Sequence, residues 1–294
     1  MNMQQNGRRA CFQVITDTHV TMDAQHVHNR NFERALLDIA ALEPDSMGIM
    51  HVGDITDHGW EEEYVEMARI WEQCRERGLT VPIRFAHGNH DLFGGETVAQ
   101  LERFQRFTAM PGPYHAHEVD GYLFLFLGSE QAEPERKDFA YLSVEQLNWL
   151  EQRLKSAEAG KPVFVFLHQP LMNTVSGSLE AQGWHGVIQD EELHAIVRRY
   201  PQVILFSGHT HWELGAPHAL HGGDGHSPAM LNAASVGYLW TDEDEHKSGS
   251  QGFFVDIYED RVIVKGRDFE GGRWVESAVI ELGRGVQETG GTRS

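Results

Sequence analysis

Short polar motifs of aspartate, histidine and asparagine recur along this sequence, and their side chains are of the types that hold transition metals. The motifs are Asp17-Thr18-His19, Gly53-Asp54, Gly88-Asn89-His90-Asp91, the single His168 and Gly208-His209-Thr210-His211. Carboxylate, amide oxygen and imidazole without thiolate suit a borderline divalent cation such as Mn, Fe, Co or Zn. Two such cations about 3.5–4 Å apart need a shared anionic ligand, for which a central aspartate is suited, and together they can activate water.

The positions of the motifs carry more weight than their composition. The chain has 18 histidines, so roughly one or two D-x-H or H-x-H triplets are expected by chance. All five motifs, however, follow apolar runs with strand character. The six such runs are Cys11–Thr16, Met47–Val52, Val81–Ala86, Tyr122–Leu127, Val163–Leu167 and Val203–Ser207. Each motif therefore begins where a predicted strand ends.

Segments with helical periodicity separate most of these runs. They are Phe32–Leu42, Glu61–Arg77, Thr97–Thr108, Val144–Ala157 and Asp190–Tyr200. Alternating strands and helices predict an α/β fold in which the sheet is covered on both faces. The carboxyl ends of parallel strands face one edge of a sheet, so we expect motifs from Asp17 to His211 to converge there. Glycines before Asp54, Asn89 and His209 allow sharp turns and leave space beside the metals.

After Gly208 the sequence changes to short segments broken by glycine and aspartate. Four have strand character: Ala229–Ala234, Gly252–Tyr258, Arg261–Arg267 and Trp274–Leu282. We expect antiparallel strands that complete a second sheet. No linker-like stretch or internal repeat divides the chain, so a single domain over residues 1–284 is predicted, followed by a disordered polar tail at 285–294.

Composition narrows the classes of partner. The net charge of −20 would repel a nucleic-acid backbone, so long nucleic acid is not expected as a substrate, whereas a small phosphate ester is compatible. No apolar run approaches the roughly 18 residues of a membrane helix, so no membrane partner is expected. Two cysteines and an N-terminus without signal-peptide features predict a cytoplasmic protein. A homo-oligomer is compatible with the sequence, which does not specify the assembly.

The ordered series D-x-H, G-D-x-x-D, G-N-H-D, a lone histidine after a strand and G-H-x-H resembles the calcineurin-like metallophosphoesterase family. It spans about two-thirds of the chain. The resemblance implies a four-layer α-β-β-α sandwich of mixed sheets with helices on both outer faces. It also implies two divalent metal ions. One would be held by Asp17, His19 and His211, and the other by Asn89, His168 and His209, with Asp54 bridging.

The resemblance also assigns catalytic roles. His90 would contact the phosphate and either stabilise developing charge or protonate the leaving alkoxide, and Asp57 would orient and charge His90. Asp91 is expected to hold the turn. Purple acid phosphatases have a metal-binding tyrosine where this chain has Thr56 and Asp57, so a tyrosinate-ferric site is not expected.

The stretch from Gly53 to Gly59 and the chain length look most like the branch that hydrolyses cyclic nucleotides and glycerophosphodiesters. This implies a small phosphodiester attacked in line by a metal-bridging hydroxide. Phosphomonoester, nucleotide pyrophosphate and phosphoprotein substrates remain alternatives, as does a non-catalytic scaffold on the same fold.

Four side chains are predicted to contact the substrate: Asn89, His90, His58 and Trp184. Trp184 lies in Leu171–Gln189, which lacks periodicity, and long irregular segments at an active edge often carry specificity. An ordinary surface excursion is the alternative. Glu61–Glu63 are expected to form a solvated first helical turn.

Overall fold

The computed structural model describes residues 7–132, 136–184 and 186–282. The predicted tail at 285–294 therefore lies outside the described residues, and a single domain over 1–284 stays a prediction. The helices are α1 (Val27–Leu42), α2 (Glu61–Glu76), α3 (Thr97–Thr108), α4 (Val144–Ser156) and α5 (Asp190–Val197), with a 3-10 turn, η1, at His90–Leu92. In the described part, no helix combines the length and apolarity needed to span a membrane.

Within these residues the strands form two six-stranded sheets and a two-stranded ribbon. The first sheet has the order β14 (Arg273–Glu281), β13 (Arg261–Asp268), β12 (Gln251–Ile257), β1 (Ala10–Ile15), β2 (Ile49–Val52), β3 (Ile83–Ala86). The second has the order β4 (His115–Val119), β5 (Tyr122–Phe126), β6 (Val163–Phe166), β7 (Val203–Ser207), β9 (Ala229–Asn232), β8 (Leu220–His221). The ribbon pairs β10 (Leu239–Trp240) with β11 (His246–Lys247).

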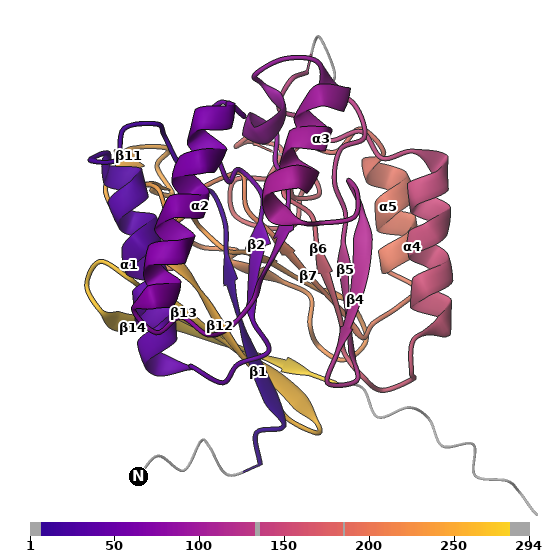
Figure 1. The fold of residues 1–294 in the computed structure, drawn as a ribbon. Helices are drawn as coiled ribbons and strands as arrows, with labels where there is room; N and C mark the ends of the chain where they lie inside the picture. The colour runs from indigo at the N-terminus through magenta and orange to yellow at the C-terminus, as the bar shows by residue number, and fades with distance from the viewer. Residues whose placement is uncertain (1–6, 133–135, 185, 283–294) are drawn as a thin grey trace, which may run out of the picture.

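The two sheets pack face to face, with helices on the outer face of each (Figure 1). Between them lies an aromatic core in which Phe12 of β1 contacts Phe164 of β6, with ring centroids 4.7 Å apart. The outer face of the first sheet is covered by α1, α2 and α3, whose Phe32, Tyr64 and Phe104 belong to a second buried cluster. Residues of α4 and α5 cover the second sheet. The four-layer α-β-β-α prediction is confirmed, because the two sheets pack against each other and helices lie on the outer face of each.

The predicted strands of the first part of the chain are present within two residues at each end. Two differences stand out in this half: β4 (His115–Val119) was not predicted, and α1 begins at Val27 instead of Phe32. The buried Asn29 side chain donates to the Thr21 and Asp23 carbonyl groups, which ties the first turn of α1 to the preceding loop.

The expectation that the C-terminal strands complete a second sheet is wrong for three of them. β12, β13 and β14 extend the first sheet, because β12 pairs antiparallel with β1 and places Phe12 opposite Val255. Only β9 joins the second sheet as expected, and it runs parallel to β7. Periodicity in the sequence indicates that a segment forms a strand. Which strand it pairs with depends on which sheet still has an unpaired edge strand in the folded chain.

The first turn of α2 also differs from expectation. Glu61 and Glu62 are exposed, but Glu63 is buried and its carboxylate accepts from the backbone N–H groups of His58 and Trp60. Glu63 therefore holds the loop that follows β2, next to one of the predicted motifs.

Candidate metal centre

The predicted motifs meet at the carboxyl ends of strands from both sheets. Asp17 and Asp54 follow the parallel strands β1 and β2, and Asn89 follows β3; His168 follows β6, and His209 and His211 follow β7. All seven predicted ligands are buried, the most exposed being His209 at 7%. The packing of two sheets against each other therefore brings residues nearly 200 positions apart into one place, as 194 positions separate Asp17 from His211.

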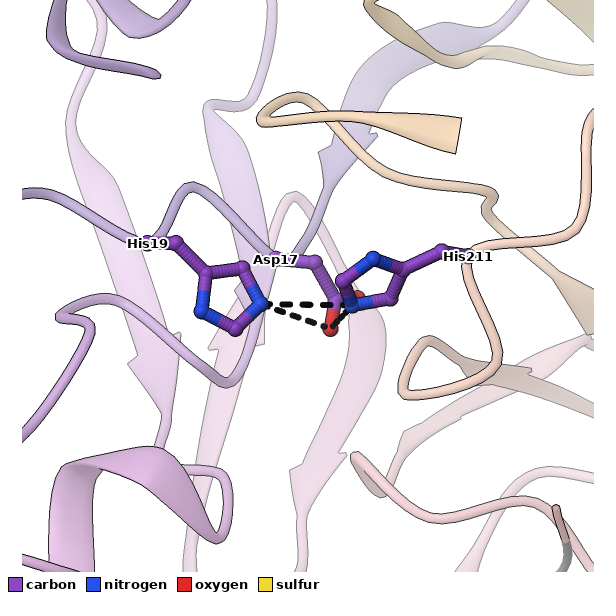
Figure 2. Close-up of side chains that lie close together, drawn as sticks. All are labelled: Asp17, His19 and His211. Carbon is purple, nitrogen blue, oxygen red and sulfur yellow. Dashed lines mark hydrogen bonds and ion pairs between the residues drawn. The ribbon is translucent and has the colours of Figure 1, made fainter. Parts of the chain in front are cut away.

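One group consists of Asp17, His19 and His211 (Figure 2). The His211 Nε2 atom lies 2.8 Å from Asp17 Oδ1 and 3.2 Å from His19 Nε2. The His19 Nε2 atom lies 3.8 Å from Asp17 Oδ1. Figure 2 shows the three side chains directed at one another, with Asp17 and His19 on the loop after β1 and His211 on the loop after β7. Their ligand atoms all lie within 4.8 Å of one another, which is compatible with a shared cation.

A second group consists of Asp54, His168 and His209, with Asn89 beside it. The Asp54 Oδ2 atom lies 3.1 Å from His168 Nε2, and Asn89 Oδ1 lies 3.1 Å from His209 Nδ1. The same Asp54 oxygen is 3.8 Å from His19 Nε2 of the first group. The Asp54 carboxylate therefore lies between the two groups.

The hydrogen bonding of His168 shows why a cation fits here. Its Nδ1 lies 2.8 Å from the Val52 carbonyl oxygen, which can only accept, so Nδ1 carries the hydrogen. In the neutral ring, the buried Nε2 atom would therefore direct a lone pair at the Asp54 carboxylate, 3.1 Å away. Two electron-pair donors facing each other in a buried site need a cation between them. The residues present thus fit a divalent metal with nitrogen and oxygen ligands.

The pKa values of the buried side chains in the metal-free chain also indicate a place for a cation. Burial alone would lower the pKa of His168, but the Asp54 and Asp17 carboxylates outweigh it and raise this pKa to about 9. Burial alone would likewise raise the pKa of Asp54, but His168 and His90 outweigh it and lower this pKa. A proton is thus held where a metal would otherwise balance the carboxylates.

Five of the seven predicted ligands adopt left-handed backbone conformations that residues other than glycine rarely adopt. They are Asp17 (φ 53°), His19 (φ 42°), Asp54 (φ 49°), His209 (φ 69°) and His211 (φ 59°). Hydrogen bonds between motifs hold these loops in place. The His209 N–H donates to Asp17 Oδ2 at 3.0 Å, and the His90 N–H donates to Asp54 Oδ1 at 2.9 Å.

His90 lies beside the first group, with its ring 4.5 Å from that of His19. Its Nδ1 donates to the backbone carbonyl of Asp57 at 2.7 Å, whereas the Asp57 carboxylate is 4.0 Å away. The hydrogen-bond partner of His90 in this structure is thus the carbonyl group of Asp57, and a role of the Asp57 carboxylate toward His90 stays a prediction. The nearest charged partners of the carboxylate are His19 Nδ1 and His58 Nδ1, both at 3.3 Å. Its position in the G-D-x-x-D motif shows that Asp57 is near the site, but the side-chain rotamer determines which residue its carboxylate contacts.

The other predicted substrate residues lie around this centre. The His58 side chain is 46% exposed and its ring stacks on Trp60 with centroids 4.3 Å apart. The Trp184 ring lies 6.4 Å from that of His209 and 6.0 Å from that of Trp240. The described part of Leu171–Gln189 contains no helix and no strand beyond a single bridge at Val187. Trp184 therefore lies next to a predicted ligand, as expected for a substrate segment.

Sequence reasoning missed Tyr238. Its ring lies 4.4 Å from that of His211 and 5.6 Å from that of His19. The segment before it is attached to the first motif, because the N–H of Gly237 donates to the Asp17 carbonyl at 2.9 Å. A parallel pairing of β9 with β7 would have placed this segment at the same sheet edge, but only the fold shows that pairing.

A family model for calcineurin-like phosphoesterases matches residues 12–213. The chain belongs to this family, whose members are metal-dependent, and it is a phosphoric ester hydrolase. It is 28% identical over 205 residues to a probable glycerophosphodiester phosphodiesterase of Arcobacter nitrofigilis, covering 67% of this chain and 70% of that one. It is 25% identical over 213 residues to a 3′,5′-cyclic-nucleotide phosphodiesterase of Nostoc, covering 68% and 70%. The resemblance inferred from the motifs, including its branch, is confirmed.

The fold is also similar to that of a purple acid phosphatase from yellow lupin seeds. The TM-score is 0.67 at 13% identity, over 92% of this chain and 53% of that chain. This chain thus spans about half the length of the lupin protein. The likeness supports the fold and carries no information about the substrate.

Proposed function

We propose that this protein hydrolyses a small phosphodiester, of the cyclic-nucleotide or glycerophosphodiester type, at a centre of two divalent cations. The observation that carries the proposal is the position of Asp54. Its Oδ2 atom lies 3.1 Å from Nε2 of His168 and 3.8 Å from Nε2 of His19. In this proposal Asp17, His19 and His211 hold one cation, and Asn89, His168 and His209 hold the other. Asp54 contributes to both.

When bound, the two cations would supply Lewis acidity and lower the pKa of a water molecule, for in-line attack on phosphorus. The chain supplies the remaining parts. His90 donates from Nδ1 to the Asp57 carbonyl, which leaves Nε2 for the substrate. In the imidazolium form, Nε2–H can donate to a phosphate oxygen or transfer its proton to the leaving oxygen. Its side chain is 29% exposed, in contrast to the buried ligands, so a substrate can reach it.

The preference for a diester is supported by the names of the relatives and by the Gly53–Gly59 loop. Monoesters, nucleotide pyrophosphates and phosphoproteins would use the same metal residues, so these become outcomes of the test. The metal-free protein would be prepared with a chelator and reloaded with Mn²⁺, Fe²⁺, Zn²⁺ or Mg²⁺ in turn. Each form would be assayed on bis-p-nitrophenyl phosphate, p-nitrophenyl phosphate, cyclic AMP and glycerophosphodiesters. A strong monoester preference would overturn the diester assignment, and inactivity with every metal would favour a scaffold.

Replacing Trp184 with alanine is expected to raise KM for the preferred diester about 2- to 12-fold, because an aromatic contact contributes roughly 0.5–1.5 kcal/mol. The metal content should not change, since Trp184 offers no ligand atom and its ring lies 6.4 Å from that of His209. Trp274→Ala is the matched control, because Trp274 lies on β14 and is 48% exposed. Unaltered kinetics in the Trp184 variant would remove this segment from the substrate site.

Replacing Gly88 with alanine is expected to lower kcat/KM at least about 100-fold, because displacing a catalytic group by about 1 Å has an effect of this size. A Cβ atom at Gly88 would lie 2.1 Å from Asp54 Oδ1 and 2.5 Å from the Asp54 backbone nitrogen. Elemental analysis should show fewer than two metals per chain. Gly215→Ala is the control, because nothing lies within 4 Å of a Cβ atom there. A Gly88 variant with full activity and two metals would argue against the position assigned to Asp54.

A further inference from the structure

The carboxylate of Asp57 lies against a predicted metal ligand without being one itself. Its Oδ1 atom is 3.3 Å from Nδ1 of His19, whose side chain is 1% exposed. The other ring nitrogen of His19, Nε2, faces Asp17 and His211, so the two nitrogens point to opposite sides of the ring (Figure 2). His19 therefore lies between a carboxylate on one side and the first ligand group on the other.

This arrangement suits one tautomer of His19. When Nε2 binds the cation, the hydrogen of the neutral imidazole resides on Nδ1, and the Asp57 carboxylate 3.3 Å from Nδ1 is a group that can only accept. The lone pair then resides on Nε2 and is directed at Asp17 and His211. A carboxylate at the second nitrogen of a ligating histidine also orients the ring and increases its basicity, and both effects strengthen metal binding.

The backbone holds the two residues opposite each other. The N–H of Asp57 donates to the Val20 carbonyl at 3.1 Å, and the N–H of Val20 donates to the Ile55 carbonyl at 2.9 Å. Val20 and Thr56 form a parallel bridge, so the segment after His19 runs beside the segment before Asp57. The contact between carboxylate and imidazole is thus built into the loop pairing and does not depend on two free surface side chains.

We propose that Asp57 is a positioning residue for the cation held by Asp17, His19 and His211, and that its carboxylate sets the affinity of this one site through His19. The inference rests on the proposed function only in assuming that this group binds a metal. In this inference the two polar groups of Asp57 have different partners. The backbone carbonyl oxygen accepts from His90, and the side-chain carboxylate contacts His19.

The test is metal binding to the chelator-treated protein, measured by calorimetric titration with Zn²⁺ or Mn²⁺. In Asp57→Asn, one of the two binding steps should weaken about 10- to 100-fold, while the other stays within about threefold of the wild type. Asp23→Asn is the matched control. Asp23 is an exposed aspartate four positions after His19, and its substitution removes the same charge as Asp57→Asn at a distance from the His19 ring. Asp57→Glu, which restores a carboxylate, should recover part of the lost affinity.

Activity measured over a range of metal concentrations separates this inference from the alternative that Asp57 acts through His90. In Asp57→Asn the metal concentration that gives half-maximal activity should rise about 10- to 100-fold, in step with the weakened binding. A large fall in kcat with unchanged metal affinity would overturn the inference, and so would unchanged affinity in both steps.

A measurement on the unmodified chain keeps the test decisive if the variant does not fold. In the Zn²⁺-loaded protein the Nδ1–H of His19 should be shifted downfield and slow to exchange with water, as for a hydrogen bond to a carboxylate. An Nδ1–H that exchanges rapidly with water would overturn the inference. A wild type that binds two cations but hydrolyses no ester would refute the proposed function while leaving the binding result intact.

Discussion

Replacing Asp54 with asparagine is expected to lower kcat/KM by at least about a thousandfold. The substitution keeps the shape of the side chain but removes the negative charge that lies between the two ligand groups. A unit charge about 4 Å from a cation contributes roughly 4 kcal/mol at the effective dielectric constant near a protein surface. Such a loss corresponds to about three orders of magnitude in rate or in metal affinity.

Steady-state kinetics on bis-p-nitrophenyl phosphate and elemental analysis would measure both effects. The variant should hold fewer than two metals per chain. Asp120→Asn is the matched control, because Asp120 lies in the turn between β4 and β5, at the opposite edge of the second sheet. An Asp54→Asn protein with two tightly bound metals and near-normal turnover would rule out a bridging carboxylate at this position.

Replacing Asp91 with alanine is expected to lower the free energy of unfolding by about 4 kcal/mol, because each buried donor left without a partner costs roughly 1–3 kcal/mol and such losses are only partly additive. The buried Asp91 carboxylate accepts from five donors. They are the N–H groups of Ile55, Thr56 and Gly88 and the hydroxyl groups of Thr56 and Tyr64. Asp91 thus joins the Asp54 loop to the Asn89 loop, as expected for a residue that holds the turn.

Urea unfolding of the metal-free protein would measure this loss without a contribution from bound metal. Asp45→Ala is the comparison, because Asp45 is exposed and such surface substitutions stay within about 0.5 kcal/mol. A loss below 1 kcal/mol in the Asp91 variant would mean that the five donors find water or other partners when the carboxylate is removed.

The residue types and their order in the sequence were sufficient to predict the chemistry and the layered fold. Metal-ligand side chains follow five apolar runs, and parallel strands must end at a common edge. That rule led us to expect Asp17 and His211 to lie together, and their closest side-chain atoms are 2.8 Å apart. Because β1 and β7 belong to different sheets, however, it is the packing of the two sheets that brings these side chains together. The ten strands that were predicted lie within two residues of their observed bounds, because apolar runs leave a local signal in the sequence, whereas β4 and the two-residue strands β8, β10 and β11 were not predicted.

Only the tertiary structure decided which strands are neighbours and which atoms of a residue meet which partner. β12 to β14 join β1 because that edge of the first sheet is free in the fold, and no local pattern records a free edge. The same holds for side chains: the loop containing Asp57 was correctly placed beside the site, but its carboxylate faces His19 and its carbonyl faces His90. Rotamers and contacts between distant segments are set by packing, to which the whole chain contributes, whereas composition and periodicity are properties of each segment alone.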